Sequence, residues 1–91
     1  MDILTLIPKG EAGKCITAKR LSEISGRSEG YIRKYINEMR TIGVPICSTT
    51  KGYYISENKA DILNTVHFLQ RRMQTQLQAV NGLIKRMKEG D

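Results

Sequence analysis

The sequence has little of what most enzymes and metal proteins require. It contains one histidine, two cysteines and no tryptophan in 91 residues. A structural zinc site takes four closely spaced ligands, whereas Cys15, Cys47 and His67 lie far apart in the chain and form no Cys-x-x-Cys or paired-histidine motif. No serine or cysteine has a recognisable catalytic partner, and no glycine-rich phosphate loop follows a predicted strand. We therefore expect no metal, no cofactor and no enzymatic activity.

Long apolar runs are also missing. No segment approaches the roughly 20 apolar residues that span a bilayer. The chain starts Met1-Asp2-Ile3, without the basic region and the small-residue cleavage site of a secretory signal. These features predict a cytoplasmic protein with no membrane partner, in which a structural disulfide is not expected. No small-molecule ligand is indicated.

Positive charge is what the chain has in excess. Lysine and arginine number 15 against 9 acidic residues, which gives a net charge of +6. In one small domain this excess indicates an anionic partner, and nucleic acid is the commonest one. A solvated basic surface that only aids solubility is the alternative.

The apolar spacing predicts three helices in the first half of the chain. A short one is expected over residues 2–6, a second over 18–25 after the cap Thr17, and a third from Ser28 to about residue 42. Their expected inward residues are Ala18, Leu21, Ile24, Ile32, Tyr35, Ile36 and Met39. Gly26 separates the second helix from the third, which is a helix-turn-helix arrangement.

The third helix carries the polar residues that a DNA-recognition helix needs. Arg33, Lys34 and Asn37 are expected to face outward, where such side chains pair with guanine or adenine edges. A solvated helix face is the plain alternative. The predicted contacts to the DNA backbone from this region are Arg27, Ser28, Tyr31 and Arg40.

A change to strand-like spacing follows this helix. Residues 44–47 and 53–55 predict a β-hairpin around the polar turn 48–52. As a wing beside the recognition helix, it would bring Thr49, Thr50, Lys51 and Tyr53 to phosphate or to the minor groove. A hairpin that only closes the core is the alternative.

The last third of the chain predicts one long helix, from Asn58 to about Lys88. Its apolar stripe repeats close to a coiled-coil period and consists of Ile62, Val66, Leu69, Met73, Leu77, Val80, Ile84 and Met87. We expect this stripe to form a homodimer, in parallel or antiparallel pairing. The alternatives are that the helix folds back onto the rest of the chain, or docks on another protein. The expected division is a DNA-binding domain over 1–56 and a dimerisation helix over 57–91.

Beyond these patterns, the chain resembles a known class of proteins. From Leu21 through Gly43-Val44 to Lys51-Gly52-Tyr53 it is similar to the N-terminal winged helix of biotin-operon repressors. It resembles more closely the small helix-turn-helix proteins of phages and prophages of Gram-positive bacteria, in Ile7-Pro8-Lys9-Gly10, Gly43-Val44-Pro45-Ile46-Cys47-Ser48 and Lys51-Gly52-Tyr53-Tyr54.

The resemblance implies a fold and a function. The fold is a winged helix-turn-helix, mainly α with a small β-wing, in which residues 15–16 add a short strand beside the last wing strand. The function is sequence-specific binding of double-stranded DNA, as a transcriptional regulator of phage or mobile-element genes. The chain has no biotin ligase domain, so the resemblance implies no ligase activity.

Overall fold

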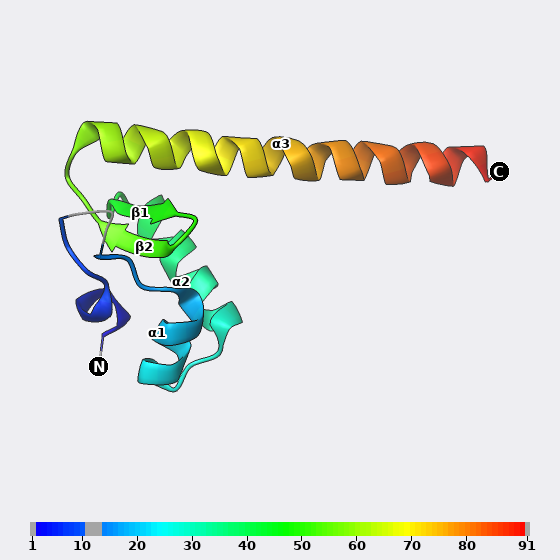
Figure 1. Ribbon diagram of the computed structural model, residues 1–91. Helices are drawn as coiled ribbons and strands as arrows, with labels where there is room; N and C mark the ends of the chain where they lie inside the picture. Colours follow the sequence, from blue (N-terminus) through cyan, green and yellow to red (C-terminus); the bar gives the residue numbers. More distant parts are fainter. Residues whose placement is uncertain (1, 11–13, 91) are drawn as a thin grey trace.

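The computed structural model describes residues 2–10 and 14–90 and is mainly helical, with one small antiparallel sheet (Figure 1). Its elements in chain order are a 3-10 turn η1 (Ile3–Leu6), α1 (Ala18–Ser25), α2 (Glu29–Thr41), β1 (Ile46–Thr49), β2 (Gly52–Ile55) and α3 (Lys59–Glu89). In Figure 1 the hairpin β1–β2 lies between α3 on one side and α1 and α2 on the other. The end of α3 projects past this body as an arm, so the molecule measures 52 × 32 × 23 Å.

The core forms where α1, α2, the hairpin and the N-terminal segment meet. Leu21, Ile32, Ile36 and Ile46 are almost completely buried there. Ile3 and Ile7 close the cluster from the N-terminal side. Ile24, expected to face inward, is instead 41% exposed, because α1 is only eight residues long and packs on α2 mainly through Ala18 and Leu21.

The expected first helix is wrong in kind, since residues 3–6 form a single 3-10 turn. Pro8 favours an extended backbone at Ile7, which ends the turn before an α-helix can develop. The Asp2 carboxylate caps the turn by accepting a hydrogen bond from the Leu4 amide, and it also accepts one from the Tyr35 hydroxyl at 2.8 Å. The Tyr35 hydrogen bond is the main cause of a lowered pKa at Asp2. The N-terminal segment is thereby attached to α2.

The strands of the hairpin differ from the predicted ranges 44–47 and 53–55, since they span 46–49 and 52–55 and leave a shorter turn. Strand β1 begins at Ile46 rather than Val44, because Gly43 and Val44 donate to the Arg40 and Met39 carbonyls in a Schellman motif that ends α2. The register pairs Ile46 with Ile55 and Thr49 with Gly52, leaving Thr50 and Lys51 as a two-residue turn.

The short strand expected at residues 15–16 is a single β-bridge at Ile16 in the structure. Ile16 forms an antiparallel bridge with Tyr53, and their backbones exchange hydrogen bonds of 2.9 and 2.7 Å. Gly52 allows this close approach. Its φ is +138°, and a Cβ built on it would lie 2.5 Å from the Ile16 carbonyl oxygen.

Helix α3 begins where the chain leaves β2. Asn58 caps it by accepting from the Ala60 amide, while Asp61 accepts from the Ser56 hydroxyl at 2.7 Å. Thr65 docks the helix on the hairpin, because its Oγ1 accepts the Ser48 amide at 3.1 Å. From Gln70 to Gly90 every residue is exposed. Among the described residues, no helix has the length and apolar character to cross a membrane.

The close approach at Gly52 generates a stability prediction. Gly52→Ala is expected to lower the free energy of unfolding by more than the ~1–2 kcal/mol of a left-handed conformation, because the new Cβ meets backbone. Gly26→Ala is the matched control, since Gly26 also has a positive φ (+75°) but has open space around it. Urea unfolding followed by circular dichroism measures both, and equal losses would contradict the steric explanation.

Candidate nucleic-acid interface

The connection between α1 and α2 is a tight, hydrogen-bonded turn. Gly26 ends α1 in the left-handed conformation that a Cβ disfavours. The Ser22 hydroxyl donates to the Arg27 carbonyl, and the Ser28 hydroxyl caps α2 by accepting the Tyr31 amide at 3.1 Å. These local contacts fix how α2 leaves the turn.

One face of α2 is locked into the core and the opposite face is open. Ile32 and Ile36 are buried, so the residues half a turn away, Lys34 and Asn37, are exposed. The two residues therefore present donors and, from Asn37, an acceptor on the outer face of the helix.

Arg33 and Arg27 lie on different edges of this face. Arg33 pairs with Glu29 at 3.3 Å across one helical turn, and it lines a hollow shared with the hairpin and α3. Arg27 stands over the Tyr31 ring, 4.9 Å from its centroid. Tyr31 and Lys34 border a separate shallow hollow with Tyr35 and Glu38.

The hairpin tip carries the second group of predicted residues. Thr50 and Lys51 form the exposed turn. Thr49 is partly buried, and its Oγ1 accepts the Lys51 amide at 3.0 Å and lies 3.4 Å from the Cys15 sulfur. The same hydroxyl thus braces the turn from inside, which leaves Thr50 and Lys51 as the outward residues.

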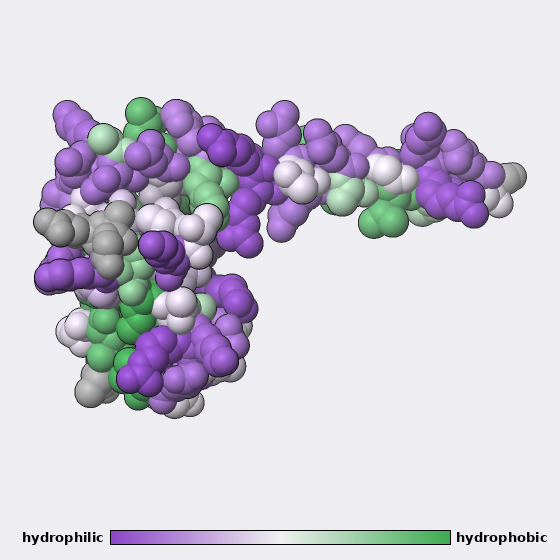
Figure 2. Space-filling view, in the orientation of Figure 1, coloured by the Kyte–Doolittle hydropathy of each residue, from purple (hydrophilic) through white to green (hydrophobic). Residues whose placement is uncertain are grey.

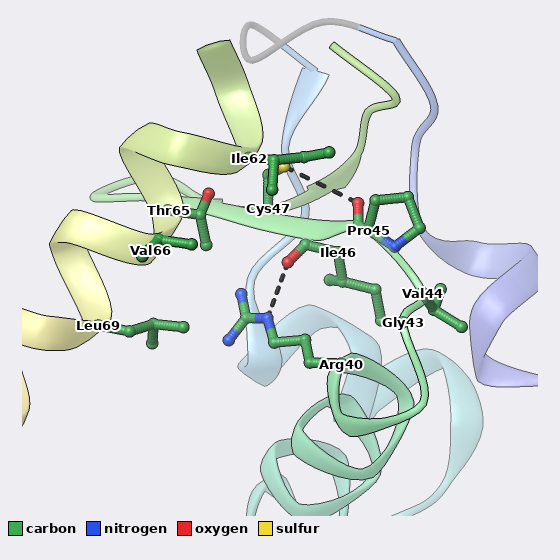
Figure 3. Close-up of a pocket in the computed structure, with 10 residues that line it drawn as sticks. All are labelled: Arg40, Gly43, Val44, Pro45, Ile46, Cys47, Ile62, Thr65, Val66 and Leu69. Carbon is green, nitrogen blue, oxygen red and sulfur yellow. Dashed lines mark hydrogen bonds between the residues drawn. The ribbon is translucent and has the colours of Figure 1, made fainter. Parts of the chain in front are cut away.

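Arg40 has a different environment from the other predicted residues. Its Nε donates to the Ile46 carbonyl at 2.7 Å (Figure 3), and its Nη2 donates to the Ser48 hydroxyl. The guanidinium also stands 5.7 Å from the centroid of the Tyr53 ring. Burial is the main cause that lowers the pKa of Arg40 below its ordinary value, and the nearby charge of Arg72 lowers it further. Arg40 therefore joins the end of α2 to β1 through its Nε and Nη2.

The predicted residues come together most closely in the hollow between α2, the hairpin and α3. Its volume is about 260 Å³. Arg33, Lys51 and Tyr53 line it with Thr49 and Thr50, and Arg72 closes it from α3. Arg72 was not anticipated as a site residue. The Arg71-Arg72 pair was visible in the sequence, but only tertiary packing brings α3 beside the hairpin.

The apolar stripe of α3 divides into two parts. Ile62, Val66 and Leu69 line an apolar groove of about 240 Å³ with Gly43–Cys47 and Arg40 (Figure 3). Beyond the body, Met73, Leu77, Val80, Ile84 and Met87 are 41–67% exposed. Figure 2 shows these apolar side chains along one edge of the arm. The alternative that the helix folds back onto the rest of the chain thus applies only to the first part of α3.

Among residues 2–10 and 14–90, no group of three or more His, Cys, Asp or Glu side chains is placed to hold a metal ion.

No protein-family model, curated protein or solved structure matches the chain. The resemblance to phage helix-turn-helix proteins therefore stays a prediction.

The position of Arg40 generates a second prediction. Arg40→Ala is expected to lower the free energy of unfolding by about 1–3 kcal/mol, because it removes hydrogen bonds from a charged donor. Lys34→Ala, on the exposed face of the same helix, is the control and should change stability by less than ~0.5 kcal/mol. Chemical denaturation measures both, and an equally stable Arg40→Ala variant would show that Arg40 does not join α2 to the hairpin.

Proposed function

We propose that this protein is a winged helix-turn-helix protein that binds double-stranded DNA sequence-specifically, with no catalytic activity of its own. The observation that carries the proposal is the division of α2 into a locked inner face and an open outer face. Ile32 and Ile36 hold the helix, so Lys34 and Asn37 project from it on a rigid backbone. The hairpin beside α2 is then the wing.

The outer face of α2 has the chemistry for reading bases. Lysine donates to guanine O6 and N7, and the asparagine amide matches adenine N6 and N7. Arg33 lies at the edge of this face, where its pair with Glu29 opposes contact with DNA. That exposed pair contributes only ~0.3–0.5 kcal/mol, so DNA can replace it at low cost.

The backbone contacts come from the two ends of the surface. The N-terminus of α2, capped by Ser28, offers amide groups and a positive dipole to a phosphate. Arg27 and Tyr31 stand together beside it, and Lys51 projects from the wing. Arg40 and Thr49 support these residues from inside, by bracing the wing against α2 and against Cys15.

Self-association through α3 completes the proposal. Five exposed apolar residues on one face of a helix with no intrachain partner favour pairing with a second copy. A dimer would present two α2 helices to successive major grooves, about 34 Å apart, and would read a palindrome-like site. The resemblance stated above adds the role of a cytoplasmic transcriptional regulator of phage or mobile-element genes.

The exposed arm also favours a second candidate function. Its apolar residues suit a helix that docks in a groove on a larger protein, such as a phage or replication protein. Variants distinguish the two functions. A docking module needs the apolar residues of α3 but does not need the polar face of α2, so substitutions on α2 should not affect it.

The first test measures binding to a mixed-sequence DNA duplex by fluorescence anisotropy across a series of salt concentrations. We expect micromolar or tighter binding that falls steeply with salt. Arg33→Ala/Lys34→Ala should weaken it at least about tenfold. Lys85→Ala/Arg86→Ala removes the same charge from the end of the arm and is the control. Absence of wild-type binding even at low salt would contradict DNA as the partner.

The same assay, after selection of a preferred site, separates base reading from backbone contact. Asn37→Ala should reduce the preference for one base position, because the adenine-type amide contact is lost. Lys51→Ala should weaken binding evenly on all sequences. An even loss for Asn37→Ala as well would exclude Asn37 from base reading.

Self-association is tested by light scattering after size-exclusion chromatography. We expect a dimer for the wild type and a monomer for Val80→Glu, because a carboxylate on the stripe cannot be buried unpaired. Gln78→Glu places the same charge on another face of the arm and should remain a dimer. A monomeric wild type would exclude pairing through α3.

A further inference from the structure

The hollow between α2, the hairpin and α3 concentrates positive charge. Arg33, Lys51 and Arg72 each come from a different element to line it. None of the eleven described residues around the hollow is Asp or Glu. A concave surface that carries one sign of charge focuses the field and attracts counter-ions of the opposite sign.

The charge is reinforced from behind the hollow. The Arg40 guanidinium donates to Ser48 and stands over Tyr53, and both of these residues line the hollow. Glu29 is the carboxylate paired with Arg33, and it reaches that guanidinium from α2, outside the lining. The exposed Glu29 pair is too weak to neutralise four clustered cations.

The rest of the lining suits a phosphate group. Thr17, Ser48, Thr49 and Thr50 supply hydroxyl groups around the hollow. The groove that Ile62, Val66 and Leu69 line is mainly apolar instead. A further hollow, lined by residues 68–76 of α3, also carries positive charge from Arg71 and Arg72, but it draws its cations from α3 alone.

We propose that this hollow binds a phosphodiester group of the DNA backbone, held between Lys51 of the hairpin and Arg72 of α3 with Arg33 at the α2 side. The inference rests on the proposed DNA binding and deepens it, because it makes α3 part of the DNA-binding surface. Arg72 lies where the arm leaves the body, and Figure 2 shows hydrophilic side chains gathered there. A phosphate in this place contacts all three elements at once.

The position of Arg72 suits this role. Its guanidinium stands 5.6 Å from the centroid of the Phe68 ring, and Phe68 also lines the hollow. The cation–π contact stabilises the position of the side chain without neutralising its charge. The adjacent Arg71 does not line this hollow, which makes it a matched control on the same turn of α3.

The test compares Arg72→Gln with Arg71→Gln in the full-length protein, on a duplex with the preferred sequence and on an unrelated one. Each lost phosphate contact reduces the slope of log affinity against log salt by about 0.9. Arg72→Gln should therefore lower the slope by about one and weaken binding to both duplexes by a similar factor. Arg72→Lys, which keeps the charge, should retain most of the slope, while Arg71→Gln should match the wild type.

The outcomes separate the inference from the proposed function. Wild-type binding with equal slopes for Arg72→Gln and Arg71→Gln would overturn the phosphate site and leave DNA binding intact. Absence of wild-type binding would overturn both. A third outcome is that inorganic phosphate stabilises the wild type against thermal unfolding, that Arg72→Gln abolishes this stabilisation, and that Arg72→Gln does not affect DNA binding. This result would identify free phosphate as the ligand and overturn the DNA backbone as the occupant.

A double-mutant cycle tests whether one phosphate joins the two elements. If Lys51 and Arg72 hold the same group, Lys51→Gln/Arg72→Gln should lose less affinity than the product of the two single losses. Independent, multiplicative losses would show that the two side chains contact different groups. Circular dichroism of each variant verifies that the fold is retained.

Discussion

The burial of Ile32 and Ile36 is the interaction on which the rest of the structure depends. These two side chains pack against Leu21 of α1 and Ile46 of β1, so one helix face organises both of its neighbours. Because α2 is fixed in rotation by this contact, the side chains that remain outside are also fixed. Burial of one face of α2 therefore determines which side chains its exposed face presents.

The hairpin depends on a second constraint, the approach of Ile16 to Gly52. The short strand at Ile16 covers one edge of a two-stranded sheet that would otherwise be marginal in water. Arg40 and Thr65 then hold β1 from two directions, through the Ile46 carbonyl and the Ser48 amide. The position of Lys51 relative to α2 follows from these three attachments.

The local elements could be predicted from the sequence because their signals are local. Thr17, Ser28 and Asn58 cap α1, α2 and α3 where expected, and the apolar spacing located the buried face of α2. What the sequence did not show depended on contacts across the fold. Arg40 was predicted to contact the DNA backbone, but its spacing did not show that β1 folds back over the end of α2 and accepts hydrogen bonds from Nε and Nη2.

The hollow lined by Arg33, Lys51 and Arg72 could not be predicted either, because it also depends on contacts across the fold. Arg72 and Lys51 are 21 positions apart in the sequence, and no periodicity relates a residue of the long helix to the tip of a turn. The docking of Thr65 on Ser48 and the packing of Ile62 and Leu69 beside β1 bring α3 across the hairpin. The sequence also did not show that α3 divides into a groove-lining part and an exposed arm. Its apolar stripe continues through both parts with nearly the same spacing.

Because one continuous helix both packs on β1 and carries the exposed stripe, the packing of α3 also affects how two copies of the protein would be arranged. Ile62 and Leu69 set the angle at which α3 crosses β1, and the helix carries this angle outward over its remaining length. If two copies pair through Met73–Met87, the separation of their α2 helices depends on the contacts of residues 59–72 as well as on the direction of the pairing. A phosphate bound beside Arg72 would lie at the point where that angle is set. DNA contact and subunit arrangement would then be properties of the same few residues.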